Sequence, residues 1–428
     1  MEASGGASAM NSDVRFTRIK VRMDEPIIVD VSAHTDAALA ASGVSIAAGA
    51  EVAIAIGSRG IADLVTVVQR VVLWVRAQGA VPFLVPAMGS HGGATAAGQR
   101  EVLESYGMTL EAVGCDIRSS MDVVELPADS CPVPVYTDAI AAAAVHTIVI
   151  NRVKPHTDFH GPYESGLMKM MAIGLGKRQQ AEALHAYGVK GLRELMPLVA
   201  HQVLAHANVV LGVAIVENAL DQTMVVEAIA AERIALDEPL LLKAAWDHLP
   251  RLITDTLDVL LVDRMGKDIS GVGMDTNVIG RIGITGQPDP DTPRINMIAC
   301  HTLTQASHGN ACGMGLADIV TRTLADAIDH DVTRTNIVTS GFLLRGKLPM
   351  VADNDRHAWE LCLRGAGVVD ASGVRAARIV DTLHCSELWV TNAVLADLDA
   401  TARSVEFDVM EQDLVLHDAD GALRSFSS

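Results

Sequence analysis

The chain has 428 residues, half of them hydrophobic and only 3% aromatic, and its formal net charge is −19. This length predicts two or three domains. The negative charge repels phosphate backbones and argues against general nucleic-acid binding, although a local cluster of basic residues can still attract an anionic substrate. The apolar residues are mainly Ala, Val, Leu and Ile, as buried parallel strands and their covering helices require.

The six cysteines are scattered and form no CxxC pair. In a chain of this size, that pattern favours reduced thiols in the cytoplasm. The first residues, MEASGGASAMNSD, contain no apolar signal core. The longest apolar runs are shorter than the roughly 18 residues that a membrane-spanning helix requires. We therefore expect a cytoplasmic protein with no membrane or nucleic-acid partner; the sequence does not indicate an oligomeric state.

The N-terminal part alternates predicted strands with predicted helices. Strands are expected at Pro26–Val29, Glu51–Ile56, Val81–Pro86, His146–Ile150, Val209–Glu217 and Thr223–Val226. Helices are expected at 61–78, 94–106, 190–207 and 238–249, with short strands and turns at 115–138. This alternation is typical of right-handed crossovers in a parallel sheet.

The pattern restarts near residue 255. Strands are expected at Leu257–Val262, 293–304, Ala377–Thr382, Leu388–Thr391 and Val405–Val409, and helices at Ala317–Ile328 and Asp355–Leu363. We predict two α/β domains with mainly parallel sheets and an active site in the cleft between them. The expected division is a disordered tail (1–15), an N-terminal domain carrying the motifs (16–255), a C-terminal domain (256–400), and a terminal segment (401–428) packing back on the N-terminal domain.

Polar residues follow three of the predicted strands where each strand ends. Arg59, His91 and His156 lie just beyond Glu51–Ile56, Val81–Pro86 and His146–Ile150. Ligands of open α/β sheets bind at the carboxyl ends of the strands. These three side chains are therefore expected to converge on one crevice.

The stretch after the third of these strands contains three histidines and a lysine, namely His156, His160, Lys169 and His185. Lys169 lies among apolar residues, where burial favours the neutral, nucleophilic amine; the alternative is an ammonium that reaches water along its aliphatic stem. On one straight helix His185 would lie on the opposite face from Lys169. A break at Gly174-Leu175-Gly176 would let them share a site.

Two weaker signals leave alternatives open. The spacing His156-x₃-His160 could bind zinc, but the chain has no HExxH motif and no cysteine nearby. The glycine-rich turn at 266–273 could hold a phosphate through backbone N–H groups, and an ordinary tight turn explains it equally well.

Several stretches also follow one another in the order of known motifs. Residues 87–95, AMGSHGGAT, are similar to an ATGTHRP-like loop, and Arg59 precedes His91 by 32 residues, as an arginine in a DHTRP-like loop does. The stretch 155–169 looks like PH…GFSGGRK, and His185 follows its final lysine at a matching interval. A DxVIV-like strand (258–262), a glycine-rich turn (271–273) and a DxN element (275–277) come next.

Together these motifs resemble those of the nickel-pincer lactate racemases, a family of 2-hydroxyacid racemases and epimerases. The resemblance covers residues 50–285 and implies a nickel-pincer nucleotide, a pyridinium-3,5-derived mononucleotide carrying nickel, attached to Lys169. It implies His185 as the nickel ligand and separate maturation enzymes as partners. The cofactor-binding residues that it implies, besides Lys169, are Ser90, Gly271, Asp275 and Asn277.

The same resemblance implies a two-base reaction at the carbinol carbon of a 2-hydroxy acid. His91 and His156 would be the bases, with His160 as a competing candidate for the second. Arg59 would bind the substrate carboxylate, since a guanidinium matches it bidentately. Arg281 would replace a lysine that the family has beyond the DxN element.

Three departures from the family pattern argue against lactate as the substrate. Ile56 replaces an acidic residue, the stretch 155–169 is longer, and its GFSGG core has become Tyr163-Glu164-Ser165-Gly166-Leu167. A larger or more polar hydroxy acid is expected. The rival hypotheses are a metal-dependent hydrolase or lyase using His156, His160 and His185, and a non-catalytic protein that binds an acidic metabolite.

Overall fold

The computed structural model describes residues 14–23, 25–57, 60–129, 131–400 and 406–426. The chain forms two compact units: Glu25–Leu249 is one, and the N-terminal residues up to Asp24 join Pro250–Ser428 in the other. Each unit is built on a mostly parallel sheet covered by helices, which confirms the predicted α/β class.

A five-stranded sheet forms the centre of the unit Glu25–Leu249. Its strands lie in the order β3 (Val81–Pro86), β2 (Glu51–Ile56), β6 (His146–Arg152), β7 (Val209–Glu217) and β8 (Thr223–Ala230). The first four are parallel, and β8 is antiparallel to β7. Strands β2 and β3 are buried over all but their first residue, because helices cover both faces of the sheet.

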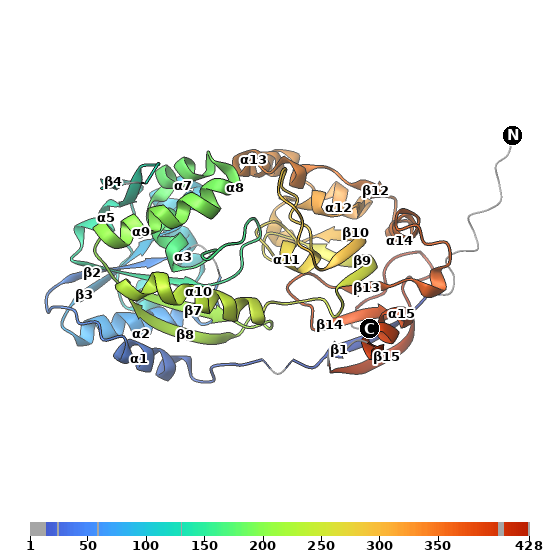
Figure 1. Ribbon diagram of the computed structural model, residues 1–428, viewed down its shortest axis with the longest axis horizontal. Coiled ribbons are helices and arrows are strands. Elements are labelled where there is room, and N and C mark those ends of the chain that lie inside the picture. Colours follow the sequence, from blue (N-terminus) through green and yellow to red (C-terminus); the bar gives the residue numbers. More distant parts are fainter. Residues whose placement is uncertain (1–13, 24, 58–59, 130, 401–405, 427–428) are drawn as a thin grey trace. The chain divides into compact units, whose positions relative to one another are not determined.

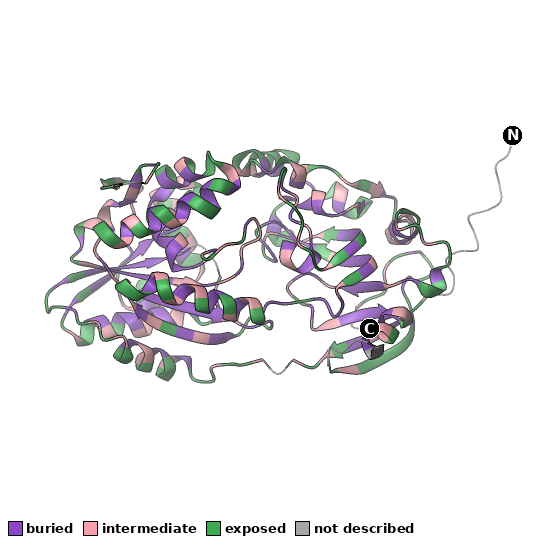
Figure 2. Cartoon of the chain, viewed as in Figure 1, coloured by how far each residue is buried: buried purple, intermediate pink, exposed green. Residues whose placement is uncertain are grey.

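Helices α1 (Val31–Ala41) and α2 (Leu64–Ala77) cover one face of this sheet, and α9 (Met196–His206) and α10 (Ala231–Asp247) cover the other (Figure 1). Helix α2 buries apolar residues at helical spacing and leaves its outer face exposed (Figure 2). A Cβ on Gly212 in β7 would lie 2.6 Å from Leu167, so only glycine allows the segment at Leu167 to approach the sheet this closely.

Shorter elements connect these layers. They are α3 (Ala96–Ser105), α4 (Leu110–Val113), the hairpin β4 (Val123–Leu126) and β5 (Val135–Asp138), α5 (Ala139–Ala143), α6 (Leu167–Lys169), the π-helical turn η2 (Met170–Gly174), α7 (Lys177–His185), α8 (Gly188–Lys190) and the π-helical turn η3 (Gly191–Leu195).

The second unit contains an eight-stranded sheet. Its order is β12 (Met350–Ala352), β11 (Ile319–Thr321), β10 (Arg294–Leu303), β9 (Thr256–Met265), β13 (Ala376–Ile379), β14 (Glu387–Thr391), β1 (Arg15–Val21) and β15 (Phe407–Val415). The first five strands are parallel, whereas β14, β1 and β15 pair antiparallel with their neighbours.

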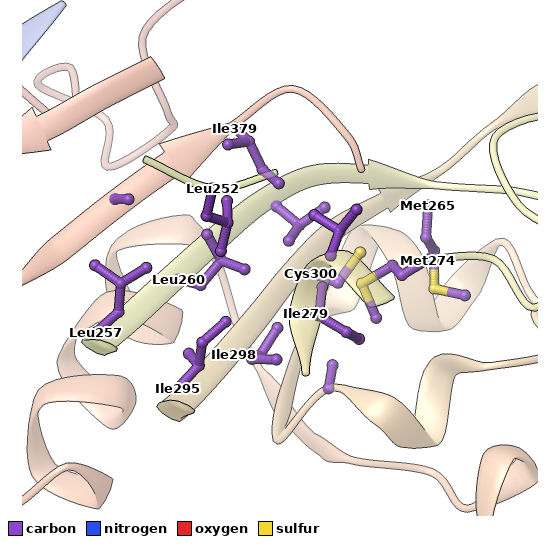
Figure 3. Packing of buried hydrophobic residues seen from close by; sticks show 14 of the residues in the cluster. Leu252, Leu257, Leu260, Met265, Met274, Ile279, Ile295, Ile298, Cys300 and Ile379 are labelled. Carbon is purple, nitrogen blue, oxygen red and sulfur yellow. The ribbon is translucent and has the colours of Figure 1, made fainter. Parts of the chain in front are cut away.

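Apolar cores lie on both faces of this sheet. Figure 3 shows Leu260, Ile298 and Ile379, from three neighbouring strands, packed with Ile279 of α11 (Thr276–Ile279) on one face. Trp359 of α14 (Asp355–Gly365) belongs to the core of the other face. The remaining helices of the unit are α12 (Arg322–Asp326), α13 (His330–Ser340) and α15 (Asn392–Ala400). No helix in the described part of the chain is long and apolar enough to cross a membrane.

The division of the chain differs from the expected one at its ends. Strand β1 lies between β14 and β15, so residues 16–21 belong with the C-terminal sheet, and strand β15 of the terminal segment pairs with β1. The boundary falls at Leu249, just before Pro250. Of the expected disordered tail, residues 1–13 lie outside the described residues, and Arg15 already begins a strand. The residues that pair with β1 lie more than about 360 positions further along the chain, which local patterns do not reveal.

Two predicted elements are wrong, and a third, the helix 238–249, is present but begins earlier than predicted. Pro26–Val29 is not a strand, and Val29 is 94% exposed. The expected helix 317–328 is instead strand β11 followed by the short helix α12, because Ile319 and Val320 pair with β10 and the Thr321 hydroxyl caps the helix. Helix α10 begins at Ala231, earlier than predicted, and contains Pro239.

Candidate active site

The loops that carry the candidate residues leave one edge of the five-stranded sheet. Strands β3, β2 and β6 are parallel neighbours, so their carboxyl ends meet at this edge. The loop after β3 carries His91, and the loop after β6 carries His156 and His160. Arg59, which follows β2, lies outside the described residues.

A buried carboxylate organises the loop after β6. Glu164 is 1% exposed and accepts a hydrogen bond from the backbone N–H of His156 at 2.6 Å and from that of Gly161 at 3.3 Å. The Nδ1 atom of His160 lies 3.2 Å from the same carboxylate. The sequence indicated Glu164 only as a departure from the family pattern; its structural role depends on burial, which the sequence did not disclose.

The two histidines of this loop face different partners. The His156 Nε2 atom lies 2.5 Å from the amine of Lys169, and its ring packs on Phe159 with centroids 4.5 Å apart. His160 instead contacts Trp246 edge to face at 5.0 Å. Among the described residues, no group of three or more His, Cys, Asp or Glu side chains is placed to hold a metal ion. The geometry therefore joins His156, and not His160, to the lysine.

Lys169 ends a short helix whose beginning is held by another buried carboxylate. The amides of Leu167 and Met168 donate to Glu238 of α10, with the Met168 bond at 2.8 Å. Burial raises the pKa of Glu238 to about 7, and the two backbone hydrogen bonds oppose that rise. A Cβ on Gly166 would lie 2.4 Å from this carboxylate, so glycine is required there.

The expected break between Lys169 and His185 is present. The π-helical turn η2 follows Lys169, and α7 begins at Lys177, whose φ of 53° is left-handed. His185 is the last residue of α7. Loss of hydration lowers the pKa of His185, a positive charge on Lys169 lowers it further, and Asp158 opposes both effects. Lys169 and His185 thus lie within electrostatic reach of each other.

Lys177 joins α7 to the loop that carries His91. Its side chain is fully buried, donates to the Pro86 carbonyl at the end of β3 and to Gln99 Oε1, and pairs with the equally buried Asp138 at 2.9 Å. Gln99 in turn donates to the carbonyls of Gly89 and His91 at 2.8 and 3.3 Å. We name Lys177, Asp138 and Gln99 the buried hub.

The hub was not predicted from the sequence. Lys177 follows a glycine-rich turn, as many exposed lysines do, and only its burial reveals its role. The loop that the hub holds leaves Ser90 and His91 exposed. Gly92 in that loop has a φ of 63°, and a Cβ there would lie 2.6 Å from the backbone of α3. The hub therefore fixes the backbone beneath His91 and leaves the imidazole accessible.

The other predicted residues belong to the second unit. Asp275 is buried and caps α11 by accepting from the Asn277 amide at 3.0 Å. Gly271 accepts a bond from Lys267 at 2.5 Å in the turn that precedes α11. The Arg281 guanidinium donates to the carbonyls of Leu316, Ile295 and Asn296 and pairs with Asp318 at 2.8 Å. These bonds hold the Arg281 guanidinium against backbone carbonyls and a carboxylate of the second unit.

The residues around Lys169 suit a group attached to its amine and bound to a metal. Lys169 is half-buried, its sequence neighbours Met168 and Met170 are buried, and its amine contacts His156. The lowered pKa of His185 favours the neutral imidazole, which is the form that binds a metal ion.

The sequence matches no family model and no curated protein. The fold is similar to that of solved structures. One is the lactate racemase apoprotein from Thermoanaerobacterium thermosaccharolyticum, with a TM-score of 0.52 over 86% of this chain and 99% of that chain, at 10% sequence identity. At this identity the similarity establishes the fold that the two chains share.

Proposed function

We propose that this chain is a racemase or epimerase of a 2-hydroxy acid that uses a nickel-pincer nucleotide tethered to Lys169. The observation that carries the proposal is the 2.5 Å contact between the Lys169 amine and His156 Nε2, at the carboxyl edge of a parallel sheet. The fold shared with a lactate racemase apoprotein supports it. The motif order around these residues supports it independently of the fold.

Held by Lys169, with His185 as its metal ligand, the nucleotide would supply reversible hydride transfer at the carbinol carbon of the substrate. His156 would accept the hydroxyl proton at Nε2. In the unloaded chain the Nδ1 atom of the same ring accepts a hydrogen bond from the Asp158 backbone N–H at 3.0 Å, and the Asp158 carboxylate lies 3.8 Å from it.

His91 would serve the opposite face of the planar keto acid. Its loop follows β3, and β3 and β6 flank β2, so His91 and His156 approach the same sheet edge from two sides. Arg59, between them in the strand order, would bind the substrate carboxylate. A substrate larger or more polar than lactate is proposed, because Glu164 and its neighbours replace the small residues of the family motif.

The test is to co-express the chain with nickel-pincer maturation enzymes and to measure intact mass, nickel content and the site of modification. We expect one pyridinium-derived adduct on Lys169 and one nickel per chain, together with loss of optical purity in one member of a panel of 2-hydroxy acids. His185→Ala should retain the adduct and lose nickel.

His206→Ala is the matched control, because His206 also ends a helix and instead pairs with Asp129 at 3.1 Å. It should retain both adduct and nickel. An unmodified Lys169 without nickel would refute the proposal. Tight binding of a hydroxy acid by such an unmodified chain would favour the non-catalytic alternative.

A further inference from the structure

The segment that follows β15 turns back on itself and lies against the start of α14. We name residues 416–426 the C-terminal strap. His417 and Leu423 form an isolated antiparallel bridge within it. Leu423 and Phe426 pack against the apolar core that contains Trp389, and the rings of Phe426 and Trp389 have centroids 5.9 Å apart. The strap therefore covers part of one face of the eight-stranded sheet.

Two neighbouring residues at the start of α14 hold the strap. The Asp355 carboxylate accepts a hydrogen bond from the Leu423 N–H at 2.8 Å, and its other oxygen lies 2.9 Å from the Nδ1 atom of His301 on β10. Arg356 donates to two carbonyls of the strap, both at 3.0 Å. Asp355 thus joins the strap to a buried histidine of the sheet.

A second attachment, at β13, involves no histidine. The Arg378 guanidinium donates to the carbonyl of Arg424 at 2.8 Å and lies over the rings of Trp389 and Phe426. Arg378 also pairs with Asp263 of β9 at 2.8 Å. The charge of this guanidinium is therefore balanced where it meets the strap.

Two buried imidazoles take part in the contact between the strap and α14. His301 is 2% exposed and His417 is 6% exposed. The Nε2 atom of each ring is buried and has no hydrogen-bond partner among the described residues. A charged ring carries an N–H on both nitrogens, and a buried N–H without an acceptor is costly. The contact therefore favours neutral imidazoles and penalises charged ones.

The charged groups around His417 set the size of this penalty. They are Asp355 and Arg356 of α14 and His301 of β10. Burial and, after it, the positive charge of Arg356 lower the pKa of His417 to about 4, and His301 contributes in the same direction. A hydrogen bond with the Asp355 backbone and the negative charge of the Asp355 carboxylate oppose the shift.

We propose that the C-terminal strap is an acid-released cover of this sheet: it stays docked on α14 while His417 is neutral and detaches when that ring gains a proton. Detachment brings the ring into water, where its charge is hydrated. It also uncovers the side of the core that Leu423 and Phe426 cover. A fall in pH would thereby open an apolar face of the C-terminal unit.

The sign of the pH dependence follows from the His417 ring. Its pKa is about 4 in the docked strap, and the released ring regains the ordinary value of 6.5. Between these values the released strap binds a proton that the docked strap does not, so docking weakens as the pH falls. Burial by itself would raise the pKa of Asp355, but the hydrogen bonds from His301 and Leu423 hold it below 3.8, so this carboxylate stays charged throughout the interval.

Hydrogen exchange of the full chain at pH 7.5 and pH 5.0 tests the release. The amides of Leu423 and Arg424 report docking, because the first donates to Asp355 and the second to the Leu416 carbonyl. Each exchange rate is divided by the intrinsic rate at the same pH. We expect protection of the strap to fall about thirtyfold at pH 5.0, since that pH lies about 1.5 units below the pKa of the released ring and each unit is tenfold. Peptides from β2, in the other unit, should not lose protection.

Two variants assign the effect to one ring. His417→Asn keeps a donor near the position of Nδ1 and does not titrate, so strap protection should differ by less than about twofold between the two pH values. His384→Asn is the matched control. His384 belongs to the same unit and also pairs with a buried carboxylate, Asp381 at 2.7 Å, but its side chain is 58% exposed and it lies outside the strap. This control should retain the full fall in protection.

Equal protection of the wild-type strap at the two pH values would overturn the proposal, and so would an undiminished fall in His417→Asn. Carbon-13 NMR of the His417 ring in wild type needs no variant. The ring should stay neutral at pH 5.5 while the strap is docked, although an ordinary histidine is mostly charged there. A charged ring in a protected strap would overturn the proposal even if His417→Asn fails to dock. None of these measurements involves Lys169 or the nucleotide, so they stand or fall separately from the proposed function.

Discussion

At the scale of single residues, this chain uses buried carboxylates to hold the backbone around its reactive groups. Glu164 ties the ends of the His156 loop together, and Glu238 holds the start of the helix that presents Lys169. Both accept hydrogen bonds from backbone N–H groups, which stabilise a negative charge. Neither role can be read from sequence, because an isolated glutamate is usually exposed.

Glu238 should make the stability of its unit depend on pH. Its pKa is about 7 in the folded chain, against an ordinary value near 4.5. Between these values the folded state retains a proton that the unfolded state loses, so stability falls as pH rises from 4.5 to 7. Glu238→Gln removes this titrating group. The free energy of unfolding of the wild type, taken relative to that of the variant, should therefore fall by about 3 kcal/mol between pH 4.5 and pH 8.

Urea unfolding of both proteins at pH 5 and pH 8 measures the effect. Gln keeps an acceptor for the Met168 amide, so the comparison isolates the charge. Glu232→Gln, at an exposed position on the first turn of the same helix, is the control for the substitution itself. A wild-type-to-variant difference that is equal at the two pH values would show that Glu238 is not the group that titrates.

At the scale of elements, the buried hub links the helix that ends at His185 to the loop that holds His91. Lys177 begins α7, Asp138 caps α5, and Gln99 lies on α3. A single ammonium thus joins three segments, and its pKa is lowered by burial while Asp138 opposes that shift. Two candidate residues, on separate elements, therefore depend on one buried ion pair.

Replacing one partner of the Lys177–Asp138 ion pair should destabilise the unit strongly, and replacing both charged groups should destabilise it less. Lys177→Met leaves the Asp138 carboxylate buried without its counter-charge and should destabilise the unit by about 3–5 kcal/mol. Asp138→Asn keeps an oxygen that can accept from Ala141 and so retains the cap of α5. The double variant should be more stable than Lys177→Met alone.

Denaturant titration of the wild type, both single variants and the double variant completes this cycle. Gln180→Met is a matched control: Gln180 is a buried polar residue of the same helix, bonded to β5 rather than to the His91 loop. If the loss of unfolding free energy in the double variant equals the sum of the losses in the two single variants, Lys177 and Asp138 act independently.

The sequence predicted much of the candidate site but not the buried residues that hold it in place. The strands that end before His91 and His156, and the break between Lys169 and His185, follow from local patterns that the structure reproduces. The partners of these residues come from far along the chain: Glu238 lies 70 residues beyond Met168, and Asp138 lies 39 residues before Lys177. Such long-range contacts are specified by packing, which a single sequence does not display.

At the scale of the whole molecule, long-range contacts also decide how the chain divides into units, and local sequence patterns did not predict that division fully. The apolar runs predicted β2, β3 and β7 to the residue, because strands buried on both faces are continuous in sequence. The placement of β1 depends on β14 and β15, two strands near the C-terminus. A short strand with mixed polarity carries no local sign of which sheet it joins.

This placement gives a test of how the units fold. The fragment 25–249 contains all five strands of its sheet and the helices on both faces, so it should fold alone and unfold cooperatively. The fragment 250–428 lacks β1, which lies between β14 and β15. Without it β15 has no partner in the sheet and the edge of β14 is exposed, so this fragment should aggregate or remain partly unfolded.

Appending residues 14–23 to the C-terminus of the fragment 250–428 through a flexible linker supplies the missing strand. Far-UV circular dichroism and urea unfolding of the three fragments would show whether cooperative folding returns with β1. A linker carrying the same ten residues in scrambled order controls for solubility alone. Cooperative unfolding of 250–428 without β1 would show that the parallel strands β9 to β13 form a stable sheet by themselves, leaving β1 to cover an edge that the unit can tolerate.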